Sequence, residues 1–286
     1  MSNGNEQHSP IEVLNGFNTV LMGPSGTGKT HAIGTLVETG LEVFYIPLES
    51  GAESLVAYWT DKGERVPPNL HLHALQQPQS SFMDIAEAAK KTNSLPHDAV
   101  MKMVDARRTK YDGYLKLLTA LHGFTDQRTG EVFDPADQWG TDRAIVLDGL
   151  TGLNDYAMAL VIGGRAERTQ TDWGVAQAYV MSLIKKLTDG CRCHFILIAH
   201  VEREVDVVQG GVKLMVSTLG KAIAPIIPSK FSDVVLTKKD VNKFSWSTAE
   251  ANADVKNRNL PLGSGLQPSF GPLYEKWLSR AKGAQS

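Results

Sequence analysis

Short runs of apolar residues alternate with longer segments of mixed polarity along most of the chain. Runs of this length predict strands, and segments with apolar residues at helical spacing predict helices. The strands are expected at 18–22, 43–48, 70–75, 144–148, 194–199 and 233–237, with a further segment at 243–248 that pairs with the last one as a hairpin. The alternation predicts an α/β fold whose mostly parallel central sheet is flanked by helices and ends in a C-terminal hairpin.

The middle of the chain departs from this alternation. Helices are expected at 30–37, 82–91, 99–122 and 274–281, whereas 125–142 has the Gly, Asp and Pro content of a loop. We therefore expect a flexible segment at 1–16 and a single domain at 17–286, with a less regular helical insertion at about 90–140. The basic residues of the 99–122 helix form either a solvated face or a nucleic-acid contact.

Composition limits the partners, the metal sites and the cellular location that the protein can have. The chain has 286 residues, of which 42% are hydrophobic, and a formal net charge of −2, so any contact with nucleic acid must be local. The apolar runs are far shorter than the roughly 20 residues of a membrane span, and the N-terminus lacks signal-peptide features. Cys191 and Cys193 lack the second ligand pair of a zinc site, and core packing is the preferred interpretation. We expect a cytoplasmic protein with no membrane partner.

The segment after the first predicted strand matches G-x-x-x-x-G-K-[ST] in full, which is the motif of a phosphate-binding P-loop. Its residues are Gly23, Pro24, Ser25, Gly26, Thr27, Gly28, Lys29 and Thr30, and His31 follows. Backbone N–H groups and a helix N-terminus in such a loop attract phosphate, so the segment predicts an ATP site. Lys29 is expected to contact the β- and γ-phosphates, and the Thr30 hydroxyl to bind Mg²⁺.

Three polar residues end other predicted strands. Asp148 follows a purely apolar run and is expected to help hold Mg²⁺. Gly149 stands where AAA+ machines carry their catalytic Glu, and this departure counts against that class. Glu49 is expected to activate the attacking water, the alternative being a solvated strand-end carboxylate. His200 either contacts the γ-phosphate and reports its presence to the next loop, or bonds to the backbone.

With these residues the chain resembles the RecA-like recombinases and hexameric-helicase ATPases. It looks most like the phage-encoded, RecA-like single-strand annealing proteins of the Sak type, from about Phe17 to Leu278. Besides the P-loop, the resemblance rests on the order of several short marks: Glu49-Ser50-Gly51, Val146-Leu147-Asp148-Gly149-Leu150-Thr151, Thr171-Asp172-Trp173-Gly174, Ile198-Ala199-His200 and Val255-Lys256-Asn257-Arg258.

The resemblance implies single-stranded DNA binding, help in annealing or strand exchange, and homo-oligomers with ATP between subunits. A single-strand-binding protein is a further candidate partner. The DNA would face the loops 152–172 and 201–221, which carry Arg165, Arg168, Arg203 and Lys213. Lys256 and Arg258 stand where ring helicases carry a pair of cations that reaches a neighbour's ATP, the alternative being a solvated surface pair.

Two other functions share the same motifs. A ring-forming, helicase-like DNA motor would usually carry an additional N-terminal assembly domain, and about 17 residues precede the core. A small-molecule kinase or regulatory nucleotide-binding module would bind ATP without DNA, and a kinase would need a lid with clustered arginines. A duplex-unwinding assay distinguishes the first alternative, and the response of ATP turnover to single-stranded DNA distinguishes the second.

Overall fold

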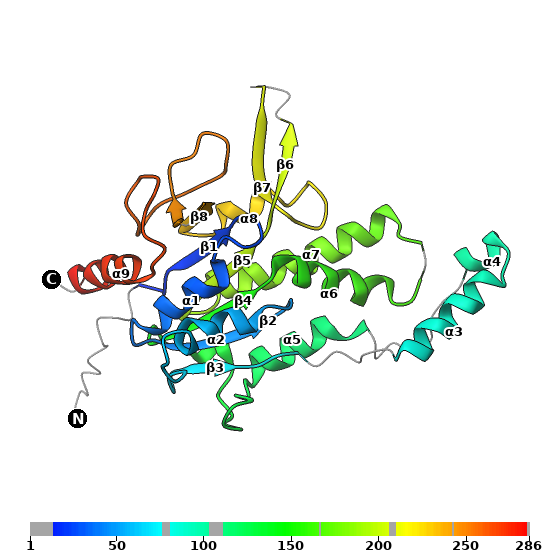
Figure 1. The fold of residues 1–286 in the computed structure, drawn as a ribbon, viewed down its shortest axis with the longest axis horizontal. Coiled ribbons are helices and arrows are strands. Elements are labelled where there is room, and N and C mark those ends of the chain that lie inside the picture. The colour runs from blue at the N-terminus through cyan, green and yellow to red at the C-terminus, as the bar shows by residue number, and fades with distance from the viewer. Residues whose placement is uncertain are drawn as a thin grey trace, which may run out of the picture.

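A seven-stranded sheet forms the centre of the computed structural model, which describes residues 14–75, 81–102, 111–165, 167–205, 210–241 and 243–284 (Figure 1). The strand order is β3-β2-β4-β5-β1-β8-β9. The strands are β1 (Asn18–Met22), β2 (Glu42–Pro47), β3 (Leu70–Leu72), β4 (Arg143–Asp148), β5 (His194–Ala199), β8 (Asp233–Asp240) and β9 (Lys243–Ser247). Every neighbouring pair is parallel except β8 and β9, which form an antiparallel hairpin.

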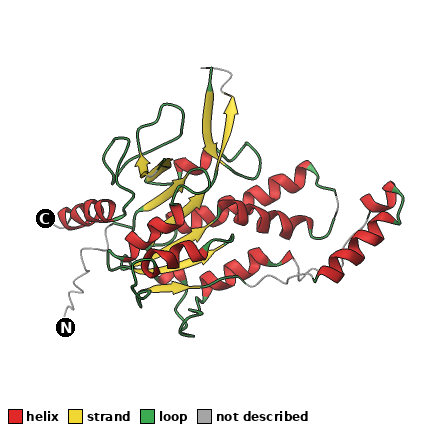
Figure 2. Cartoon of the chain, viewed as in Figure 1, coloured by secondary structure: helices red, strands yellow, loops and turns green. Residues whose placement is uncertain are grey.

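Helices cover both faces of this sheet (Figure 2). One face packs against α1 (Lys29–Val37), α2 (Ala52–Thr60) and α9 (Gly271–Gly283). The other packs against α5 (Gly113–His122), α6 (Leu150–Ile162) and α7 (Gln170–Asp189). In β1, for example, Leu21 faces the first layer while Val20 and Met22 face the second, as the period of two in a strand requires. This architecture confirms the predicted fold class.

Two pairs of elements extend from the core in Figure 1. One is the antiparallel hairpin of β6 (Val201–Val205) and β7 (Val212–Val216). The other comprises α3 (Phe82–Asn93) and α4 (His97–Met101), which lie beyond the ends of α5 and α7. Two short helical turns, η3 (Ala136–Gln138) and α8 (Ile226–Ser229), complete the described elements.

Several predicted boundaries were wrong. The helix expected at 99–122 is interrupted, because α4 ends at Met101 and α5 begins only at Gly113, the second residue of an Asp-Gly pair that is typical of turns. The segment 152–172 was expected to be a loop, yet α6 continues to Ile162, with buried Leu153 and Ala157 at helical spacing. The predicted loop 201–221 contains the regular β6–β7 hairpin.

Candidate nucleotide site

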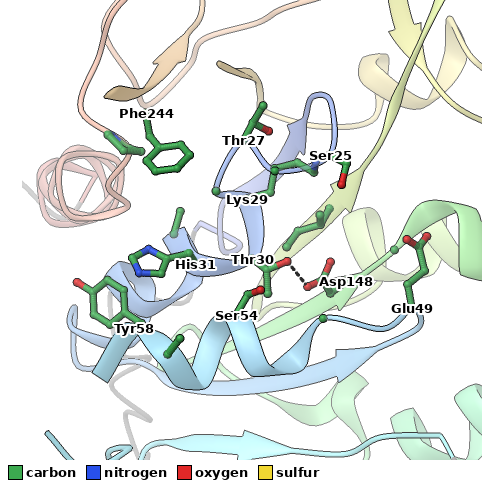
Figure 3. Close-up of a pocket in the computed structure, with 18 of the residues that line it drawn as sticks. Ser25, Thr27, Lys29, Thr30, His31, Glu49, Ser54, Tyr58, Asp148 and Phe244 are labelled. Atoms are coloured by element: carbon green, nitrogen blue, oxygen red, sulfur yellow. Dashed lines mark hydrogen bonds between the residues drawn. The ribbon is translucent and has the colours of Figure 1, made fainter. Parts of the chain in front are cut away.

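A pocket of about 690 Å³ opens at the carboxyl ends of β1, β2, β4 and β5 (Figure 3). The P-loop lies between β1 and α1 and forms one wall, together with His31. Glu49, Asp148 and His200, which the sequence placed at three different strand ends, line the same pocket. Parallel strands direct their carboxyl ends to one edge of the sheet, and the predicted site residues therefore meet there.

The P-loop has the backbone conformation that its glycines allow. Gly26 and Gly28 have φ angles of 74° and 78°, a region that favours glycine. Gly28 is the N-cap of α1, so the amides of the helix's first turn point into the pocket entrance. Together with the helix dipole, they give the loop a positive potential suited to phosphate.

Lys29 is the buried cation of the site, with its side chain folded back along the loop. Its Nζ donates to the carbonyl oxygens of Gly23 at 2.9 Å and Pro24 at 2.8 Å. Burial lowers the pKa of Lys29 to about 8, although the carboxylates of Asp148 and Glu49 oppose the shift. The lysine is therefore charged at neutral pH and loses its charge in mildly alkaline solution.

Asp148 accepts two hydrogen bonds on one oxygen. Oδ2 receives the Thr30 hydroxyl at 2.7 Å and the Tyr45 hydroxyl at 2.5 Å. Burial raises the pKa of Asp148, and nearby Glu49 adds to this, whereas the two hydroxyl bonds lower it. The two hydroxyls thus favour the ionised carboxylate at a buried position.

Thr30 and Asp148 together fit Mg²⁺ in the way that P-loop proteins hold it. No cluster of three or more His, Cys, Asp or Glu side chains able to hold a metal occurs among the described residues. Mg²⁺ binds readily through one or two protein oxygens, with substrate phosphates and water completing its shell. The Thr30 hydroxyl and the Asp148 carboxylate, already in contact, would supply those oxygens.

Glu49 lies between a backbone amide and an imidazole. Its Oε1 accepts the Gly152 N–H at 3.0 Å, and its Oε2 lies 3.3 Å from Nε2 of His200. Gly149 leaves the room for this side chain, since a Cβ at position 149 would lie 2.7 Å from both Cγ and Oε1 of Glu49. The glycine after Asp148 thus leaves room for the carboxylate of Glu49, which comes from the end of β2 and not from position 149.

Aromatic side chains form the far end of the pocket. The Phe244 ring, on β9, would lie 3.3 Å from a Cβ at Gly28, and the rings of His31 and Tyr58 are 4.9 Å apart. Tyr58 reaches this position because α2 packs tightly on α1 at Gly34, where any side chain would overlap the tyrosine ring. The planar apolar surfaces suit a nucleobase.

The β8–β9 hairpin also holds the phosphate end of the pocket. The Thr237 hydroxyl lies 2.7 Å from that of Thr27 and contacts the carbonyl of Met22 at 3.2 Å. A Cβ at Gly23 would come within 2.2 Å of this hydroxyl, so β8 needs glycine at the first P-loop position. The hairpin thus touches the P-loop at its beginning and, through Phe244, at its end.

Lys256 and Arg258 lie outside the pocket of their own chain. Residue 256 bridges Val234, near the amino end of β8, while the P-loop follows the carboxyl end of β1. Lys256 Nζ donates to the Phe231 carbonyl at 2.6 Å, and the Arg258 amide donates to Asp233 at 2.7 Å. Their predicted action on a neighbour's nucleotide stays a prediction.

The four cations predicted to bind DNA lie in two parts of the chain, between α6 and α7 and on the β6–β7 hairpin. Arg165 pairs with Asp172 at 2.7 Å, and Lys213 of β7 pairs with Asp254 at 2.6 Å. Arg203 is exposed on β6, and Arg168 is exposed ahead of α7. Two of the four charges are therefore already compensated within the chain.

Sequence reasoning missed Tyr45, Tyr58, Phe244 and Thr237. Tyr45 and Thr237 sit inside strand patterns in which any apolar or β-branched residue would look equally suitable. Tyr58 belongs to α2, a helix that was not predicted. The sequence predicted a hairpin strand at 243–248, but not that its Phe244, which is 42% exposed in the structure, would line the pocket.

The comparison with protein families agrees with this site. The protein family described as an AAA domain matches residues 15–259. The chain belongs to this AAA-domain family. No curated protein is similar enough to count as a match.

Among solved structures, the RadB recombinase is 16% identical to this AAA-domain protein, with a TM-score of 0.38 over 87% of this chain and 85% of that one. TcpA, the pCW3 conjugation coupling protein, in a monomer form with ATPγS, is 14% identical, with a TM-score of 0.33 over 93% and 65%. Neither similarity is high enough to carry a functional argument.

Family and geometry together identify a P-loop ATPase of the AAA-domain family. The Gly149 that follows Asp148, which counts against AAA+ machines, does not prevent the match to the AAA domain, and the Glu49 side chain fills the space beside it. No helix among the described residues is long and apolar enough to cross a membrane.

Proposed function

We propose that this P-loop protein hydrolyses ATP with Mg²⁺ while bound to single-stranded DNA, and that it assists annealing or recombination as a cytoplasmic homo-oligomer. The observation that carries the proposal is the contact between Glu49 and His200. It joins the candidate base of hydrolysis to the residue immediately before the β6–β7 hairpin. His200, which contacts Glu49 in the pocket, is thus followed directly by the first residue of the hairpin.

Each side chain of the pocket has a role in this proposal. The P-loop amides and Lys29 hold the phosphates, and Mg²⁺ at Thr30 and Asp148 would neutralise charge on the β- and γ-oxygens. Glu49 accepts a proton from the attacking water, and the Gly152 amide and His200 hold its carboxylate in place. When a γ-phosphate attracts His200, the imidazole shifts relative to Glu49 and moves the start of β6.

The DNA part of the proposal rests on the hairpin and on the resemblance to single-strand annealing proteins of the Sak type. The His200 carbonyl accepts the Ser217 amide at 2.8 Å, so both ends of the hairpin are fixed at the pocket. Arg203 is exposed on this hairpin. Burial raises the pKa of Asp155, the charge of Arg168 opposes this shift, and the charge of Glu49 adds to it. Cations close to the hydrolytic side of the pocket can link DNA binding to turnover.

The test is ATP turnover with and without single-stranded DNA, compared with DNA affinity at several salt concentrations. Stimulation by DNA, a shallower salt dependence in Arg168→Ser/Arg203→Ser, and normal behaviour of the α9 control Lys276→Ser/Lys282→Ser would support the proposal. The control removes the same charge from an exposed helix elsewhere. Turnover that ignores DNA would indicate a regulatory module, and duplex unwinding would indicate a helicase-like motor.

A further inference from the structure

Helix α3 presents large apolar side chains to solvent. Phe82 is 91% exposed, Met83 68% and Ile85 54%, and none of the twelve residues of α3 is buried. Phe82, Ile85, Ala86 and Ala89 follow helical spacing along one face, whereas Asp84, Glu87 and Lys91 occupy the opposite face. An amphipathic helix of this kind ordinarily buries its apolar face.

Local sequence features favour the helix α3, although nothing in the described structure covers its apolar face. Ser81 and Asp84 form a capping box, with the Ser81 hydroxyl accepting the Asp84 amide and Asp84 accepting the Ser81 amide. Lys90 and Lys91 in the last turn complement the helix dipole. Even so, a helix of 12 residues is marginal in water without tertiary packing. We therefore expect the apolar face of α3 to pack against another surface.

A complementary surface exists on the same chain. A groove of about 630 Å³ runs between α5, α6 and α7, and its walls are almost entirely apolar. Leu115 and Leu118 of α5 are 51% and 40% exposed, and Val175 and Tyr179 of α7 are both 42% exposed. Tyr114 fixes the floor by donating its hydroxyl to the Tyr179 carbonyl at 2.8 Å.

We propose that α3 of one chain docks into the α5–α7 groove of a second copy of this chain. Helix-in-groove association uses apolar side chains at the spacing of Phe82, Ile85 and Ala89. In Figure 1, α3 lies just beyond the ends of α5 and α7, so helix and groove belong to the same end of the molecule. Two chains that meet at this end can exchange their α3 helices reciprocally.

The buried area favours a second copy over an unrelated partner. A helix of this length is roughly 18 Å long and about 10 Å wide, so one docked helix buries only part of the ~800 Å² per partner of a stable interface. Reciprocal exchange doubles the contact and covers both exposed surfaces of each chain. A foreign helix would fill the groove and leave α3 in solvent. This contact does not depend on the proposed ATP-linked function.

The first experiment is sedimentation of the full chain without nucleotide or DNA. The wild type should associate, and Phe82→Glu/Ile85→Glu and Leu118→Glu should each weaken association at least tenfold. Lys91→Glu, which changes the charge of α3 by the same amount on its polar face, and Leu262→Glu, at a 72% exposed site elsewhere, should associate like the wild type. Circular dichroism and retained ATP binding check that the variants are folded.

The second experiment identifies the contacting surfaces. Chains with Ile85→Cys are mixed with larger, tagged chains that carry Leu118→Cys, and the thiols are joined by a short bismaleimide; native Cys191 and Cys193 are only 3% and 1% exposed. Cross-linking between the two kinds of chain would support the proposal. A monomeric wild type, or the lack of a cross-link between the two kinds of chain, would overturn the proposal. A double variant, Ile85→Cys/Leu118→Cys, that cross-links only within single chains would overturn it as well. Lys29→Ala should associate normally, which separates this contact from the ATP-linked function.

Discussion

The Glu49 side chain fills the space that a side chain at position 149 would need. Gly149 also has a φ of 125°, so a substitution there strains the backbone as well as displacing the carboxylate. Gly149→Ala should therefore lower the rate of ATP hydrolysis by about 10²-fold while nucleotide affinity changes little, as Glu49→Gln should.

The control for Gly149→Ala is Gly40→Ala. Gly40 has a φ of 87° and open space around its Cα, so this variant strains the backbone without touching Glu49. Its turnover should stay near the wild-type rate. If Gly149→Ala and Glu49→Gln both hydrolyse ATP normally, Glu49 is a structural carboxylate and another base must be sought.

Lys29 gives nucleotide binding a defined pH dependence. Its pKa in the free protein is about 8, and the triphosphate binds the charged form. The dissociation constant for ATP should be constant near pH 7 and rise above pH 8 toward about tenfold per pH unit, because binding must then take up a proton. Calorimetry in two buffers of different ionisation enthalpy measures that proton directly.

Lys29→Arg serves as the reference for this profile. Arginine keeps its charge throughout the range, so the affinity of this variant, although lower, should stay level from pH 7 to pH 9.5. A wild-type profile as level as that of the arginine variant would show that Lys29 is charged throughout.

The Tyr45 hydroxyl supports the ionised form of Asp148. Tyr45→Phe removes a hydrogen bond that lowers the pKa of this buried carboxyl, so protons should compete more strongly with Mg²⁺. The Mg²⁺ concentration for half-maximal turnover should rise by about tenfold, and more at pH 6 than at pH 8. Tyr274→Phe, on α9, should leave the Mg²⁺ dependence unchanged, and an equal response in the two variants would contradict the role of Tyr45.

Phe244 is expected to contact the nucleobase. Phe244→Ala removes a ring whose stacking is worth about 1–3 kcal/mol, so the dissociation constants of ATP and GTP should both rise by roughly 5- to 150-fold. Inorganic tripolyphosphate, which has no base, provides the comparison within the same variant. If tripolyphosphate binding weakens equally, the ring acts on the conformation of the P-loop at Gly28 instead.

Arg258 can reach a nucleotide only in another subunit, since it lies at the opposite end of the sheet from its own P-loop. Arg258→Ala and Lys29→Ala chains should each be inactive, and their mixture should regain part of the turnover, because a mixed site combines one intact P-loop with one intact arginine. No recovery in proven mixed oligomers, or normal turnover by Arg258→Ala alone, would remove this residue from the site.

The sequence was sufficient to predict the strands of the sheet and the polar residues at their ends. Apolar runs mark buried parallel strands, and the topology alone brings Glu49, Asp148 and His200 together. A glycine-rich loop between a strand and a helix is equally specific, and the predicted P-loop runs from the end of β1 into the first turn of α1.

What could not be predicted depends on packing between distant segments. Gly34 admits Tyr58 to the pocket, yet neither residue signals this in its local pattern. Helix α6 was obscured by Gly152, which faces the Leu48 carbonyl and has no room for a side chain. The charge compensation of Arg165 and Lys213 likewise needs partners 7 and 41 positions away, which no spacing rule identifies.

The contact of the β8–β9 hairpin with both ends of the P-loop has a kinetic consequence. Thr237 and Phe244 belong to one hairpin, and Lys239 lies 5.4 Å from the centre of the Phe244 ring, so the hairpin holds the aromatic group firmly. The phosphate and base ends of the pocket then loosen together when the hairpin moves. We therefore expect the residence time of the spent nucleotide to depend on two strands at the edge of the sheet, which carry none of the groups expected to take part in hydrolysis.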